Sequence, residues 1–99
     1  MEVHINEIPK LLNEDNVEIL DVREINELSE EGYIEGTRHT PMSEFDVEPV
    51  SLDKDKKYYI MCRAGGRSAR VVEYMEHNGY DATNLEGGIS AYDGEKLFK

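Results

Sequence analysis

The sequence predicts an α/β fold in which helices cover both faces of a parallel sheet. Strand-like and helix-like segments alternate along the 99 residues, and this order suits parallel strands because each crossover between them needs a helix. Residues 58–61 are aromatic and aliphatic throughout, as expected of a strand buried on both faces. Two glycines and an amphipathic segment follow, which indicates a strand, a tight loop and a helix in succession.

The N-terminal half contains the first strands and helices of this order. Pro9 suits the first turn of a helix, and Gly32 suits the position just past a helix end. Residues 41–52 are expected to be mostly loop, with room for one helical turn. The strands expected here cover residues 2–5, 17–22 and 37–39. The helices expected here cover residues 7–13 and 25–31.

The C-terminal half contains the most regular helix. Ala69, Val72 and Met75 share one face at helical spacing, so residues 68–76 predict an amphipathic helix. Asn78 and Gly79 stop it. A last strand and a short closing helix are expected over residues 82–85 and 89–92. We therefore expect one domain over residues 1–99.

Cys62, the only cysteine, is the strongest candidate for a catalytic residue. It lies at the carboxyl end of the strand over residues 58–61, where parallel sheets bind ligands. The loop after it should direct free N–H groups and the positive end of a helix dipole toward an anion. Such surroundings can lower the pKa of a thiol from about 8.5 to roughly 3.5–7.5, so Cys62 would be a thiolate without a general base.

The neighbours of Cys62 favour this functional interpretation over an inert one. A lone cysteine after a strand is most often a small buried hydrophobic residue. Here, however, Gly65 and Gly66 add nothing to a core, and positive Arg63 and Arg67 oppose the helix dipole. No Asp or Glu occurs from residue 56 to residue 72, although the chain has 22 of them. This acid-free segment favours a site for a negatively charged ligand.

Three other charged residues receive a structural interpretation. Asp21 and Arg23 follow a hydrophobic strand, and Glu86 precedes two glycines. A carboxylate near Cys62 would raise the pKa of its thiol, so Asp21 is expected to cap a loop or form an ion pair rather than act as a base. Glu86 is expected to be a turn or cap residue for the same reason.

Composition excludes several classes of partner. The net charge of −11 argues against nucleic acids and anionic membranes, since phosphate groups bind through cationic side chains. His4, His39 and His77 are scattered, so no metal site and no cofactor are predicted. The chain has no long apolar stretch, and its N-terminus lacks the pattern of a signal peptide, which predicts a cytoplasmic protein.

Four motifs together resemble the rhodanese, or sulfurtransferase, family. Cys62 to Arg67 is similar to its six-residue loop, cysteine-x-x-glycine-x-arginine. The segments 19–24, 32–41 and 85–92 resemble its Asp-Val-Arg strand end, its Gly-His-Ile-x-Gly segment and its Glu-Gly-Gly tail. Three packing or loop positions depart from the pattern: Tyr33 replaces His, Thr37 replaces Ala and Tyr92 replaces Trp.

The resemblance implies a three-layer α/β fold with a central five-stranded, mostly parallel sheet flanked by helices. It also implies two-step sulfur transfer through a persulfide on Cys62. The donor would be thiosulfate or a low-molecular-weight persulfide, and the acceptor cyanide, a small thiol or a protein. Arg63 and Arg67 would hold the anion, Ala64, Gly65 and Gly66 would act through their backbone, and Ser68 would donate a hydrogen bond or cap the helix.

Two alternatives remain open. Phosphatases and arsenate reductases of the related kind place the arginine six positions after the cysteine, whereas Arg67 follows Cys62 by five. The shorter loop fits a sulfur atom better than a phosphoryl group. The second alternative is a non-catalytic binding module of the same fold, although such modules often lose the cysteine.

Overall fold

A computed structural model describes residues 2–43 and 52–98, in which five strands form one sheet. The strand order is β1-β5-β4-β2-β3, and all four pairings are parallel, so the predicted parallel sheet is confirmed. β4, the strand that ends next to Cys62, occupies the centre of the sheet. The strands are β1 Glu2–His4, β2 Val17–Asp21, β3 Arg38–His39, β4 Lys57–Met61 and β5 Asp81–Glu86.

The helices differ from the sequence prediction mainly at their starts. The helix expected over residues 7–13 is observed as the shorter α1 with a 3-10 turn before it, and Pro9 lies in the first turn of α1 as expected. The helix expected to start at Ser68 begins two residues earlier, directly after Gly65. Residues 44–51 of the loop expected over 41–52 lie outside the described residues. The helices are η1 Ile5–Glu7, α1 Ile8–Leu11, α2 Ile25–Glu31, α4 Gly66–His77 and η2 Ile89–Ala91.

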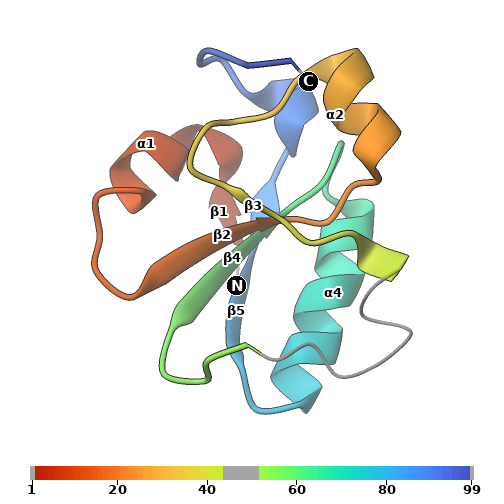
Figure 1. The fold of residues 1–99 in the computed structure, drawn as a ribbon. Coiled ribbons are helices and arrows are strands. Elements are labelled where there is room, and N and C mark those ends of the chain that lie inside the picture. Colours follow the sequence, from red (N-terminus) through yellow and green to blue (C-terminus); the bar gives the residue numbers. More distant parts are fainter. Residues whose placement is uncertain (1, 44–51, 99) are drawn as a thin grey trace.

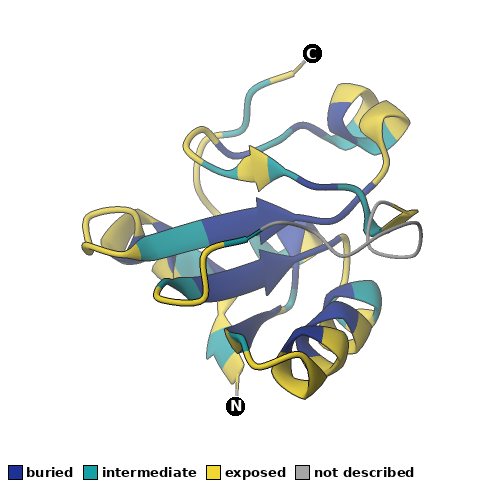
Figure 2. Cartoon of the chain, turned by 60° about the horizontal axis from the view of Figure 1, so that its bottom comes forward, coloured by how far each residue is buried: buried dark blue, intermediate teal, exposed yellow. Residues whose placement is uncertain are grey.

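Helices lie on both faces of the sheet, α1 on one and α4 on the other (Figure 1). Tyr58 and Ile60 of β4 pack with the α4 side chains Val71, Val72 and Met75. Tyr59 and Met61 point the opposite way and pack with Ile5, Ile8 and Leu11. Figure 2 shows the resulting pattern, with central strands buried and outer helix faces exposed. Alternation along β4 therefore puts the next residue, Cys62, on the α4 side.

α2 lies beyond the carboxyl ends of the strands, next to the start of α4 (Figure 1). It begins with a capping box, in which the Glu24 side chain accepts a hydrogen bond from the Glu27 N–H and the Glu27 side chain accepts one from the Glu24 N–H. Leu28 anchors it in the interior, and Gly32 ends it with a φ of 83°. This placement turns the acidic side chains of α2 toward the loop that follows β4.

Within residues 2–43 and 52–98, no helix has the length and apolar character needed to cross a membrane.

Candidate active site

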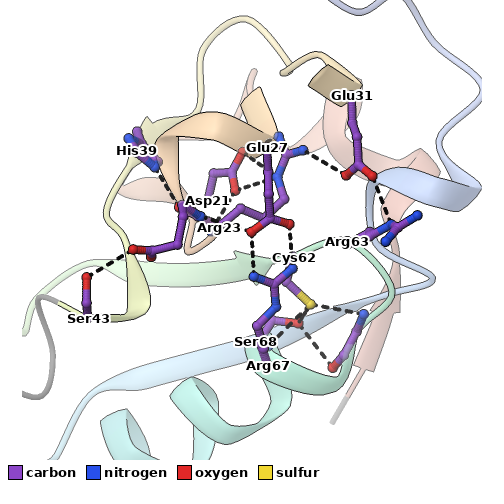
Figure 3. Close-up of polar contacts among 12 residues, drawn as sticks. Asp21, Arg23, Glu27, Glu31, His39, Ser43, Cys62, Arg63, Arg67 and Ser68 are labelled. Carbon is purple, nitrogen blue, oxygen red and sulfur yellow. Dashed lines mark hydrogen bonds and ion pairs between the residues drawn. The ribbon is translucent and has the colours of Figure 1, made fainter. Parts of the chain in front are cut away.

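Cys62 lies at the base of the loop that joins β4 to α4 (Figure 3). Its Sγ accepts hydrogen bonds from the backbone N–H groups of Gly65, at 3.0 Å, and Ser68, at 3.4 Å. Only 1% of the residue is exposed. Gly65 has a φ of 105°, a conformation that a side chain would strain, and this turn directs its N–H at the sulfur. The loop therefore surrounds the sulfur with donors, as the sequence predicted.

The hydrogen bonds decide the pKa of Cys62. Burial raises the pKa of the thiol, but donation from the Ser68 hydroxyl and from the N–H groups of Ser68, Gly65 and Ala64 outweighs burial. The net effect is a pKa below the ordinary value of a cysteine. The acidic thiol expected from the sequence is thus explained mainly by hydrogen bonds within the loop.

Asn84 is a residue of this site that the sequence analysis missed. It is buried in β5, and its Oδ1 accepts a hydrogen bond from the Ser68 hydroxyl at 2.5 Å. Its Nδ2 donates to Glu2 Oε2 at 2.9 Å and to Gly65 O at 3.3 Å. An asparagine inside the expected last strand was the available signal, since a buried amide needs polar partners. Asn84 connects the loop and Ser68 to β1.

The turn after β5 holds the loop from the other side. Ile89 N–H donates to Cys62 O at 2.9 Å, and Ser90 N–H donates to Arg63 O at 3.0 Å. A Cβ on Gly88 would lie 2.5 Å from these same carbonyl groups. The glycine pair Gly87-Gly88 therefore allows the close approach that keeps the Cys62 loop in place.

Both loop arginines pair with acidic residues of α2. Arg67 donates to both carboxylate oxygens of Glu27, at 2.6 and 2.7 Å, and Arg63 Nε lies 2.9 Å from Glu31 Oε2 (Figure 3). The hydrogen bonds from Arg67 lower the pKa of Glu27 to about 2, and the same pair raises the pKa of Arg67. The segment around Cys62 contains no Asp or Glu. The fold supplies acidic partners for both arginines from α2, which is distant in the sequence.

Asp21 forms an ion pair, as the sequence predicted. Its carboxylate accepts hydrogen bonds from Arg23 N–H, Nε and Nη2, the last at 2.7 Å, and both side chains are buried. Arg23 Nη2 also donates to Gly32 O at 2.9 Å, which joins the end of β2 to the end of α2. Glu86 is exposed and is the last residue of β5. Among the described residues, no three His, Cys, Asp or Glu side chains gather as metal ligands.

The sequence model of the protein family described as "Rhodanese-like domain" matches residues 4–95 of the chain. The chain belongs to the rhodanese-like domain family. A Bacillus subtilis protein named "Putative sulfurtransferase YtwF" is 37% identical over 86 residues, which cover 87% of this chain and 82% of that protein. A protein of Allochromatium vinosum named "Sulfurtransferase" is 31% identical over 84% of this chain and 78% of its own length.

Solved structures with sequences similar to this chain share its fold. The crystal structure of a rhodanese-like domain protein from Staphylococcus aureus is 40% identical, with a TM-score of 0.82 over 99% of this chain and 98% of that one. The structure of SSP1007 from Staphylococcus saprophyticus is 41% identical, with a TM-score of 0.77 over 90% of each chain. The rhodanese fold implied by the sequence motifs, a five-stranded sheet flanked by helices, is confirmed.

Proposed function

We propose that this rhodanese domain is a sulfurtransferase in which Cys62 carries the transferred sulfur as a persulfide. One observation supports the proposal above the others: the N–H groups of Gly65 and Ser68 and the Ser68 hydroxyl converge on Cys62 Sγ itself. Donors in this arrangement stabilise a thiolate and the negative charge of a persulfide. Relatives named as sulfurtransferases support the same reaction class.

The reaction has two steps, and each is a substitution at sulfur. The Cys62 thiolate attacks the outer sulfur of the donor, a new S–S bond forms, and the old bond breaks with its electron pair leaving on sulfite or on a thiolate. An acceptor such as cyanide or a thiol, in solution or on a protein, then attacks the outer sulfur of the persulfide. Cys62 leaves as a thiolate, so the cycle closes without an external oxidant or reductant.

The other loop residues bind the donor in this proposal. Ala64, Gly65 and Gly66 act through their backbone, and Ser68 donates from its hydroxyl and its N–H. Arg63 and Arg67 supply positive charge for an anionic donor and for the departing group. Gly65 is required for its backbone conformation. A Cβ built on Gly66 would meet no atom of the described residues within 4 Å, apart from its chain neighbours and the backbone of its own helix.

Burial of the nucleophile favours sulfur over a phosphoryl group as the transferred unit. Cys62 is only 1% exposed, so a slender terminal sulfur reaches it more easily than a tetrahedral phosphoryl group does. A free, reduced thiol is also needed for each cycle, and the cytoplasm maintains thiols in that state. We therefore place the domain in the cytoplasm, acting as one unit over residues 1–99.

The experiment is a measurement of intact mass after the reduced protein is incubated with thiosulfate or with glutathione persulfide. We expect the gain of one sulfur atom, its removal by cyanide, and the appearance of thiocyanate. Cys62→Ser should show no gain while its circular dichroism spectrum stays that of the folded protein. Failure of both donors to add sulfur, or sulfur transfer that persists in Cys62→Ser, would overturn the proposal.

A further inference from the structure

Glu31 lies between two arginines and is shared unequally by them. Its Oε2 is 2.9 Å from Arg63 Nε, and its Oε1 is 3.8 Å from Arg23 Nη1. Oε1 and Nη1 are both buried, and among the described residues neither has a hydrogen-bond partner. Two polar atoms of opposite charge thus face each other about 1 Å beyond the distance of a charge-assisted hydrogen bond.

The two arginines differ in exposure and in their other contacts. The side chain of Arg63 is 63% exposed, and that of Arg23 is fully buried. Asp21 and Gly32 O already bind Nε and Nη2 of Arg23, so Nη1 is the group that lacks a partner. Closing the gap between Glu31 and Arg23 would satisfy two buried atoms at once, so Arg23 offers Glu31 a second partner when Arg63 leaves it.

Within residues 2–43 and 52–98, Arg67 forms an ion pair with no acidic side chain other than Glu27. Glu27 binds it with two hydrogen bonds of 2.6 and 2.7 Å, a paired geometry that holds both side chains in one position. The side chain of Glu27 is 18% exposed and that of Arg67 37%. Arg67 therefore contributes its charge from a fixed place at the loop.

We infer that Arg63 is the movable cation that captures anionic sulfur donors, and that Glu31 controls it by moving from Arg63 to Arg23 when the donor binds. The inference rests on the sulfurtransferase function proposed above. Without a donor, Glu31 neutralises Arg63 and disfavours anions at the loop. With a donor, Arg63 turns to its anionic group, and the buried Arg23 takes up Glu31.

The charge of Arg63 defines the class of sulfur donor. Arg63 would recognise a negative group next to the sulfane sulfur, such as the sulfonate end of thiosulfate or the carboxylate of an amino-acid persulfide. A donor with no other charged group, such as the persulfide of 2-mercaptoethanol, gains little from Arg63. Glu31 and Arg63 are thus selectivity residues, and their effect should depend on the charge of the donor.

The test compares the rate of sulfur loading, kcat/KM, for thiosulfate and for the persulfide of 2-mercaptoethanol. Glu31→Gln frees Arg63, so the ratio of the thiosulfate rate to the 2-mercaptoethanol persulfide rate should rise about two- to fivefold, the range of an exposed ion pair. Arg63→Gln should lower the same ratio by at least as much. In the double variant, Glu31→Gln should have no further effect, because Glu31 acts through Arg63.

Glu30→Gln is the matched control. Glu30 precedes Glu31 in α2 and is exposed, and its replacement changes the net charge by the same amount. The ratio for Glu30→Gln should equal that of the wild-type protein. A rise as large as that of Glu31→Gln would mean that overall charge alone sets selectivity, and the inference would be wrong. The inference would also be overturned if Glu31→Gln changed the ratio equally in the wild-type protein and in Arg63→Gln.

A crystal structure of Cys62→Ser with thiosulfate tests the movement itself. We expect Glu31 Oε1 within about 3 Å of Arg23 Nη1, and Arg63 on the sulfonate. Glu31 still bound to Arg63 in that complex would refute the movement. Loading of the wild-type protein separates the two claims. Loading by both donors without any influence of Glu31 removes only this inference, whereas loading by neither of them nor by glutathione persulfide removes the proposed function as well.

Discussion

The Ser68 hydroxyl has one proton and three acceptors around it. Asn84 Oδ1 is 2.5 Å away, Gly65 O is 3.2 Å away and Cys62 Sγ is 3.3 Å away. When Cys62 is a thiol, the hydroxyl can donate to Asn84 and accept from the sulfur. When Cys62 is a thiolate, donation to the sulfur becomes the stronger bond, since hydrogen bonds to charged acceptors exceed neutral ones. Ser68 can therefore serve both protonation states of the nucleophile.

Ser68→Ala should raise the pKa of Cys62, because its hydroxyl is the largest of the influences that lower this pKa. The rate of alkylation by iodoacetamide, measured against pH, reports the thiolate. Its midpoint should move to higher pH in Ser68→Ala, and the rate near neutral pH should fall. Ser90→Ala is the control, since the exposed Ser90 touches the loop through its backbone N–H. An unchanged midpoint in Ser68→Ala would contradict this account.

At the scale of elements, the site is assembled where three segments meet the loop after β4. α2 supplies the carboxylates that pair with the two arginines of the loop, and β5 supplies Asn84. The turn into η2 donates hydrogen bonds to the carbonyls of Cys62 and Arg63. Each contact joins segments that are distant in sequence. The geometry around Cys62 therefore depends on the packing of elements.

Gly88→Ala should destabilise the protein and displace the loop, because a Cβ there would lie 2.5 Å from backbone atoms of Cys62 and Arg63 and the φ is 58°. We expect a loss of about 2–4 kcal/mol in the free energy of unfolding, measured by urea denaturation. Gly66→Ala is the matched control. It lies in the first turn of α4 with open space around it, and Ala favours a helix by up to about 1 kcal/mol. Equal losses in the two variants would contradict the close-approach argument.

Glu27→Gln should reduce stability at neutral pH and have less effect in acid. The pKa of Glu27 falls from 4.5 to about 2, which corresponds to about 3 kcal/mol. Because 37% of the Arg67 side chain is exposed, solvent screening reduces this to about 2 kcal/mol. The lowered pKa means that this contribution is complete above pH 4.5 and is lost as the pH falls toward 2.

Urea titrations of both proteins across this pH range check the prediction. The difference between wild-type and Glu27→Gln protein should be largest at pH 7 and should shrink between about pH 4.5 and 2. Glu30→Gln, which alters an exposed residue of the same helix, should show no such change. A difference that is the same at every pH would show that the ion pair does not cause it.

For the whole molecule, the net charge of −11 opposes an anionic donor even though the loop is basic. Added salt shortens the Debye length from about 30 Å at 0.01 M to about 8 Å at 0.15 M, so it screens the distant acids more than the adjacent arginines. The kcat/KM for thiosulfate should therefore rise, about threefold, over this range. The persulfide of 2-mercaptoethanol should show a much smaller change. A rate that falls with salt would mean that the positive loop dominates the field.

Local patterns in the sequence were sufficient for the fold class and the order of elements, and they predict Cys62 as the nucleophile. These patterns reflect backbone preference and burial, which depend on near neighbours in the sequence. They are the apolar run before Cys62, the glycines after it and the spacing of Val72 and Met75. The same patterns predicted helix starts less well. Gly65 as N-cap places the start of α4 at Gly66, and α1 is shorter than the helix expected there, because helix ends depend on single backbone conformations.

Only the tertiary structure decided how the site is held and charged. Glu27 and Glu31 reach Arg67 and Arg63 across 40 and 32 residues of sequence, and Asn84 reaches Ser68 from another strand. The sequence near Cys62 does not indicate these partners, because side-chain pairing depends on the strand order and on the position of α2. The sequence by itself thus predicted Cys62 as the nucleophile and identified the loop that surrounds it, and the fold decided which acidic side chain pairs with each loop arginine.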